Sequence, residues 1–211
     1  MRHLSVLDEL LVAADEALKA LSGAQSPGRP MPRPAAGATE LDPAARRESG
    51  ALMRVNHTGE VCAQALYSGQ ALTARDPAVR SALRTAGAEE RDHLAWCRAR
   101  LNALGDRASL LDPLWYAGSF GMGLISGLAG DRWSLGFLAE TEAQVERHLD
   151  GHLGRLPASD TASRVVLEQM RADEMRHGES GRRLGGTELP AIVKRAMQAV
   201  SKVMTTTAYR L

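Results

Sequence analysis

Two stretches of this chain with helical periodicity place a glutamate and a histidine on the apolar face, where leucine is the usual residue. Glu90 and His93 form the first Glu-x-x-His pair, and Glu174 and His177 form the second. This spacing puts both side chains of a pair on one helix face. An unpaired carboxylate on a buried face costs several kcal/mol, so each pair predicts a compensating partner. The alternative is that both Glu-x-x-His pairs occur by chance in a helical bundle and that their side chains extend to solvent.

A further glutamate precedes each pair by about one helix. Glu60 lies upstream of the first pair and Glu142 upstream of the second. Asp76 followed by proline predicts a helix start, and the midpoint between Glu60 and His93 falls at this turn. The second hairpin has the same symmetry about turn signals at 157–160. Antiparallel packing would therefore bring each upstream glutamate level with a Glu-x-x-His pair.

Four inward glutamates and two inward histidines form the ligand set of a carboxylate-bridged dinuclear metal site in a four-helix bundle. Two divalent cations would cancel four negative charges that otherwise repel one another. Oxygen and imidazole ligands fit iron or manganese better than a zinc thiolate centre. The predicted metal ligands are Glu60, Glu90, His93, Glu142, Glu174 and His177. We predict no catalytic residue beyond this metal centre.

An acidic residue directly precedes the glutamate of each pair. Metal-binding histidines usually donate their other ring N–H to a carboxylate. We hypothesise that Asp173 holds His93 and that Glu89 holds His177, so that the two contacts cross the bundle. The alternative is that both acids are solvated surface residues.

Several other residues have no assigned role in the predicted centre. Cys62 and Cys97 are expected to be small apolar packing residues, and two cysteines cannot form a disulfide framework. His148 and His152 lie on or near an apolar face and stay unassigned. Gly59, in the middle of a predicted helix, costs about 1 kcal/mol relative to alanine. It indicates that space beside the neighbouring glutamate is needed for close packing or for a ligand.

Composition favours an all-α protein. Only 8 of 211 residues are aromatic, whereas alanine, leucine, glutamate and arginine are abundant. A net charge of +1 gives no general positive field, so nucleic-acid binding is disfavoured. Asp8 and Glu9 interrupt any apolar signal peptide, and we expect an intracellular, reducing compartment.

The chain divides into three parts by its sequence pattern. Residues 1–21 carry one apolar stripe of a helix, 22–40 form a flexible linker rich in proline and glycine, and 41–211 form the bundle domain. Residues 113–130 form an apolar, glycine-rich crossover helix of borderline length for a membrane span. A basic amphipathic helix over 190–207 ends the chain. Both could lie on an anionic membrane or simply pack in the bundle.

The sequence motifs extend well beyond the six ligand positions. They comprise 52–61, 89–94, 113–116, 140–142, 148–153, 173–177 and 201–205. From about residue 42 to 211 the chain resembles the bacterial demethoxyubiquinone hydroxylase family on these motifs. All six ligand positions of the family pattern carry the expected residue.

The resemblance implies a ferritin-like four-helix bundle with an apolar crossover helix and extra terminal helices. It implies a di-iron monooxygenase that uses O2 to hydroxylate the ring of a polyprenyl demethoxyquinol in ubiquinone biosynthesis. By this analogy Glu90 and Glu174 bridge two iron ions. The implied location is the cytoplasmic face of the inner membrane, as a peripheral protein. Other ubiquinone-biosynthesis proteins are possible partners, and the electron donor is not specified.

Three other functions remain open at this point. A ferritin-like iron store can share the doubled ligand pattern, and it would form a large hollow oligomer. A rubrerythrin-like peroxidase would need paired Cys-x-x-Cys motifs, which this sequence lacks. A helical interaction protein without metal is the third, and it fails if the purified protein holds about two iron atoms per chain.

Overall fold

The computed structural model describes residues 5–35 and 40–211, and within these residues the secondary structure is entirely helical. The first four residues of the predicted N-terminal helix and 36–39 of the predicted linker lie outside the described residues. The helices are α1 (Val6–Ser22), α2 (Pro43–Thr73), α3 (Pro77–Leu104), α4 (Asp112–Leu128), α5 (Asp131–Arg155), α6 (Thr161–Arg183) and α7 (Ala191–Ala208). The all-α prediction is confirmed.

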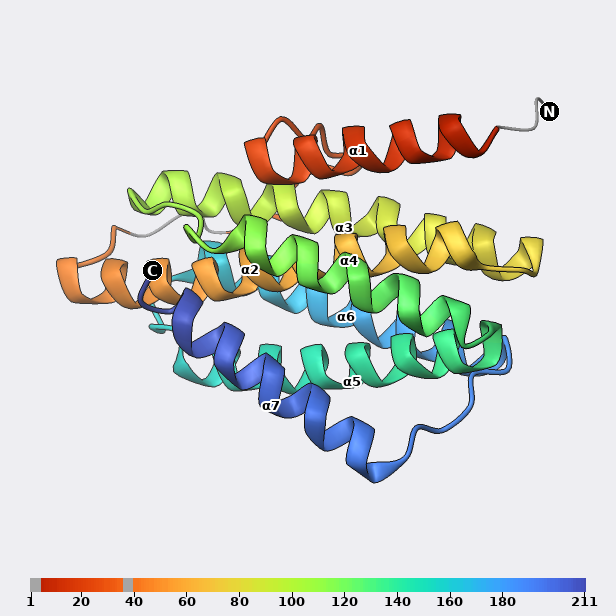
Figure 1. The fold of residues 1–211 in the computed structure, drawn as a ribbon. Coiled ribbons are helices and arrows are strands. Elements are labelled where there is room, and N and C mark those ends of the chain that lie inside the picture. Colours follow the sequence, from red (N-terminus) through yellow and green to blue (C-terminus); the bar gives the residue numbers. More distant parts are fainter. Residues whose placement is uncertain (1–4, 36–39) are drawn as a thin grey trace.

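Helices α2 and α3 form one hairpin, and α5 and α6 form another. The two hairpins pack into a four-helix bundle, and α4 connects the first hairpin to the second (Figure 1). Each predicted turn is present. The Asp76 side chain accepts a hydrogen bond from the backbone N–H of Ala78 and caps α3. Asp160 accepts from the backbone N–H of Ser163 and caps α6. These caps fix where each hairpin reverses, and hence which residues of its two helices lie level.

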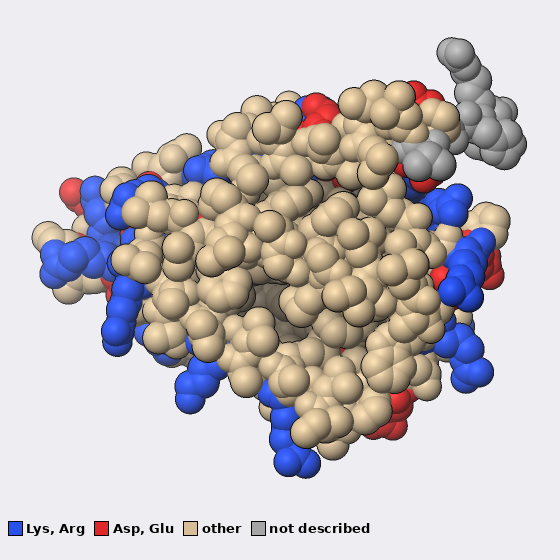
Figure 2. Space-filling model, in the orientation of Figure 1, with Lys and Arg blue, Asp and Glu red and all other residues tan. Residues whose placement is uncertain are grey.

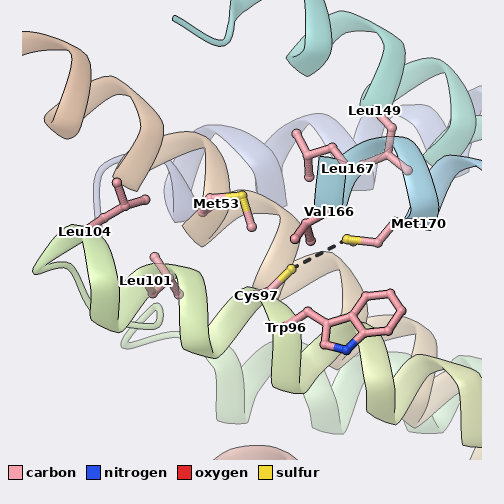
Figure 3. Close-up of a cluster of buried hydrophobic side chains, with 9 residues drawn as sticks. All are labelled: Met53, Trp96, Cys97, Leu101, Leu104, Leu149, Val166, Leu167 and Met170. Atoms are coloured by element: carbon pink, nitrogen blue, oxygen red, sulfur yellow. Dashed lines mark hydrogen bonds between the residues drawn. The ribbon is translucent and has the colours of Figure 1, made fainter. Parts of the chain in front are cut away.

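Figure 3 shows a core cluster to which the four bundle helices contribute. The Met53, Cys97 and Met170 side chains are fully buried in it. The Cys97 thiol lies 3.8 Å from the Met170 sulfur. Cys97 is therefore an apolar packing residue, as predicted.

Helix α4 lies along α2 and has one face against the bundle. A Cβ at Gly123 would collide with the backbone carbonyl of Leu66, and one at Gly127 would collide with Thr73. At the start of α4, Asp112 accepts a 2.7 Å hydrogen bond from Thr58. Gly123 and Gly127 thus serve close packing of α4 on α2, whereas a Cβ at Gly118 or Gly121 would meet nothing within 4 Å. Among the described residues, no helix has both the length and the apolarity needed to span a bilayer.

Helix α1 packs on the bundle through a different face from the predicted stripe. Leu7, Leu11 and Leu18 of that stripe are 65%, 59% and 71% exposed. Ala20 is buried instead, in a cluster with Val61 and other residues of α2, α3 and α4. A helix lying on a bundle touches it along a narrow line, and small alanine side chains let the backbones approach closely. The predicted N-terminal helix is present, and these three leucines of its apolar stripe are exposed.

Candidate metal centre

The structure brings the six predicted ligand residues together in the middle of the bundle, and all six are buried. They form two overlapping groups, and within each group one potential ligand atom per residue lies within 4.8 Å of the others. Glu60 and His93 belong to the first group, and Glu142 and His177 belong to the second. Glu90 and Glu174 belong to both, which is the position expected for bridging carboxylates.

The histidine rings point the same nitrogen toward the carboxylates. His93 Nδ1 lies 3.1 Å from Glu90, 3.2 Å from Glu174 and 3.4 Å from Glu60. His177 Nδ1 lies 3.2 Å from Glu90 and 3.3 Å from Glu174. Each imidazole therefore offers its Nδ1 atom to the space that the carboxylates surround.

The opposite ring nitrogens contact the two acids that the sequence suggested. His93 Nε2 lies 3.0 Å from Asp173, and His177 Nε2 lies 3.2 Å from Glu89. Both contacts connect α3 with α6 across the bundle, in the crossed arrangement that we hypothesised. Both ring nitrogens of each histidine face carboxylates, which can only accept hydrogen bonds. Nε2–H therefore donates to Asp173 or Glu89, and a cation held among the carboxylates would replace the proton on Nδ1.

The electrostatics of the cluster favour added positive charge. Burial, together with the neighbouring carboxylates, raises the pKa of Glu60 and of Glu142 well above the usual value. Burial opposes protonation of His177, but its contacts with Glu174 and Glu90 raise the pKa to about 12. Neither carboxylate oxygen of Glu142 has a hydrogen-bond partner among the described residues. Protons therefore neutralise part of the negative charge of these glutamates, and bound divalent cations could neutralise it in their place.

Comparison with known proteins places the chain in a family. The family model described as "Ubiquinone biosynthesis protein COQ7" matches residues 47–208. The chain belongs to the COQ7 family. This membership confirms the resemblance predicted from the sequence.

Relatives within this family are similar over almost their whole length. The Ralstonia pickettii protein is 55% identical, covering 98% of this chain and 100% of its own length. The Variovorax paradoxus protein is 56% identical, with 98% and 99% covered. The Burkholderia multivorans protein is 56% identical, with 98% and 100% covered. All three relatives are named 3-demethoxyubiquinol 3-hydroxylase.

A cavity of about 510 Å³ lies beside the cluster of carboxylates and histidines, and Glu60 forms part of its wall. Its lining comes from α2, α4, α5 and α7, and it is mainly apolar. Gly59 lines this cavity, and a Cβ there would meet nothing within 4 Å. Of the two explanations for this glycine, space for a ligand fits the structure and close packing does not.

One wall of the cavity carries a polar group that the sequence left unassigned. The buried Nε2 atom of His148 has no hydrogen-bond partner among the described residues. Its ring lies 3.8 Å from that of His152, whose Nδ1 is 2.9 Å from the Asn56 side-chain oxygen. Burial and the nearby Arg155 lower the pKa of His148 to about 4, so the ring is neutral near pH 7.

Sequence reasoning also missed Arg29, which contacts Asp173 from the segment predicted to be a linker. No helical periodicity extends through that segment, so no local pattern identified the residue.

Proposed function

We propose that this chain is a di-iron 3-demethoxyubiquinol 3-hydroxylase that adds one oxygen atom from O2 to the ring of a polyprenyl benzoquinol. The shared name of relatives 54–56% identical over nearly the whole chain supports the reaction. The observation that carries the proposal is an apolar cavity that reaches Glu60 at a buried cluster of carboxylates and histidines. An iron store would need no such cavity.

In this proposal Glu60 and His93 would hold one iron, Glu142 and His177 would hold the other, and both irons would share Glu90 and Glu174. When bound in reduced form, the two iron ions would supply the electrons and open coordination positions that activate dioxygen. The contacts of the histidines with Asp173 and Glu89 keep their Nδ1 atoms directed inward. The protein thus contributes a pre-oriented ligand set.

The cavity residues would orient the quinol and exclude water. Apolar side chains such as Leu66, Phe137 and Met197 line the space. The neutral His148 ring offers one hydrogen-bonding nitrogen for a ring hydroxyl or methoxy oxygen. Gly59 leaves room for the aromatic ring close to the Glu60 carboxylate.

We propose that the protein lies peripherally on the cytoplasmic face of the inner membrane, where a polyprenyl quinol is dissolved. In Figure 2 the face that carries α4 and α7 is largely uncharged and is hollowed near its centre, and Lys and Arg, with fewer Asp and Glu, lie at its margins. Ile125 and Leu128 of α4 are 70% and 65% exposed, and Ile192 of α7 is 73% exposed. An apolar face with a basic margin suits an anionic lipid surface.

The reaction is tested by aerobic turnover of the iron-loaded protein with a short-chain demethoxyquinol and a chemical reductant. With ¹⁸O₂, mass spectrometry should detect one labelled oxygen in the product. Iron-loaded protein that consumes O2 without forming this product would overturn the hydroxylase proposal. A large hollow oligomer in size-exclusion chromatography, with ferric iron retained, would instead favour an iron store.

A further inference from the structure

Residues 23–35, which we call the strap, leave α1 and run over α3. The backbone N–H of Gly28 donates a 2.6 Å hydrogen bond to Asp92, and Arg29 Nε donates a second 2.6 Å bond to the same carboxylate. The Arg29 guanidinium lies over the Trp96 ring, 5.1 Å from its centre. Trp96 in turn donates to the Arg29 carbonyl oxygen at 3.4 Å. Three types of contact therefore hold Arg29 in one place.

From this position Arg29 reaches the carboxylate that contacts a predicted metal ligand. Arg29 Nη1 lies 2.9 Å from Asp173 Oδ2, and His93 Nε2 lies 3.0 Å from the same oxygen. The Asp173 side chain is completely buried, and its other oxygen accepts from Gln169 at 2.8 Å. Arg176 also contacts this second oxygen, at 2.6 Å.

The other half of the centre has no equivalent anchor among the described residues. Glu89, which contacts His177, is 29% exposed, and Arg29 Nη2 comes only to 4.0 Å from it. Arg176 lies 3.2 Å from Glu89, but its own side chain is 53% exposed. A well-ordered, partly buried ion pair restricts a carboxylate more than an exposed one does.

We infer that Arg29 is a positioning residue for the metal centre: it holds Asp173 against His93 and so fixes the imidazole for the metal ion bound at Glu60 and His93. This inference rests on the metal centre of the proposed function. A buried carboxylate that loses its cation partner can rotate or protonate, and the histidine ring then loses its fixed orientation. The strap therefore makes one metal position more tightly organised than the other.

The experiment is an anaerobic titration of metal-free protein with Co²⁺, followed by visible absorption, with Fe²⁺ as the second probe. Removing an acid or carbonyl partner of a metal-binding histidine typically weakens metal binding about 10–100-fold. Because Arg29 acts one contact further away, Arg29→Gln should weaken one of the two binding steps by about 5–10-fold. Arg33→Gln, on an exposed residue of the strap, should leave both steps unchanged.

A double-mutant cycle separates this role from a general loss of packing. In the Asp173→Asn protein, adding Arg29→Gln should cause no further loss of metal affinity, because the contact through which Arg29 acts is already gone. Arg29→Lys should restore part of the affinity, since it returns the charge but not the planar guanidinium that contacts Asp92 and Asp173 at once.

Three results would overturn the inference: unchanged Co²⁺ binding in Arg29→Gln, an equal loss at both steps, or the same loss with Asp173→Asn present. A wild-type protein that binds no metal would overturn both this inference and the proposed function. A wild-type protein that binds two metal ions but hydroxylates no quinol would overturn only the proposed reaction.

Discussion

Gly59 offers a direct test of whether the cavity beside Glu60 is the substrate site. An alanine Cβ would enter open space, so Gly59→Ala removes a helix-interior glycine without a steric penalty. The gain should be about 0.8–1 kcal/mol in the free energy of unfolding. For a chain of this size that corresponds to a rise in Tm of roughly 2–4 °C, which calorimetry would measure.

A larger side chain at the same position should separate stability from activity. The side chain in Gly59→Leu would occupy cavity space next to the Glu60 carboxylate, where the quinol ring is proposed to bind. Forcing extra methylene groups into an occupied site costs about 1–3 kcal/mol. If this cost falls on the bound substrate, kcat/KM should drop about 5–150-fold, with iron content unchanged.

Gly151 on α5 is the matched control for both changes. A Cβ added at Gly151 would also meet nothing within 4 Å, but this residue does not line the cavity. Gly151→Ala and Gly151→Leu should leave quinol turnover unchanged. The cavity assignment is refuted if folded, iron-loaded Gly59→Leu turns over quinol like the wild type. A lower Tm in Gly59→Ala would refute the assignment of open space.

Three further predictions follow from packing, charge and surface. Gly123→Ala should lower the free energy of unfolding by about 1–3 kcal/mol in urea titration, because its methyl group collides with the α2 backbone, whereas Gly118→Ala on the open side of α4 should not. Metal-free protein should lose stability as the pH rises from about 7 to 8. In this range the raised pKa values of Glu60, Glu142 and His177 mean that the folded state binds more protons than the unfolded state, whereas the lowered pKa values of His148 and His152 act only at lower pH. Metal loading should remove the effect in thermal scans. Ile192→Ser should reduce co-sedimentation with anionic vesicles, and equal binding would argue against the α7 contact.

The cluster of buried carboxylates and histidines could be predicted because its determinants are local. Asp76 and Asp160 cap helices at the two hairpin turns, and these caps fix which residues of the paired helices lie level. The Glu-x-x-His spacing then fixes which side chains share a face. Even the contact between Asp173 and His93 follows, because both residues occupy known positions on helices of known register.

The position of α1 and the role of the strap could not be predicted in the same way. Helical periodicity identifies an apolar stripe, but it does not say whether another element covers that stripe. Leu7, Leu11 and Leu18 form such a stripe and are exposed, whereas small Ala20 is buried. Arg29 meets Asp173 through an irregular segment and a long separation in sequence, so no periodic pattern records their contact.

The cluster has an apolar cavity on one side and charged contacts on the other. The cavity is lined by α2, α4, α5 and α7, and no residue of α3 or α6 among those described contributes to its wall. Both predicted histidine ligands lie on α3 and α6, where their outer nitrogens contact Asp173 and Glu89. Arg29 closes this side with charged contacts. In the proposed reaction the quinol would therefore approach Glu60 through this cavity, while the contacts on the opposite side would hold the histidines in place.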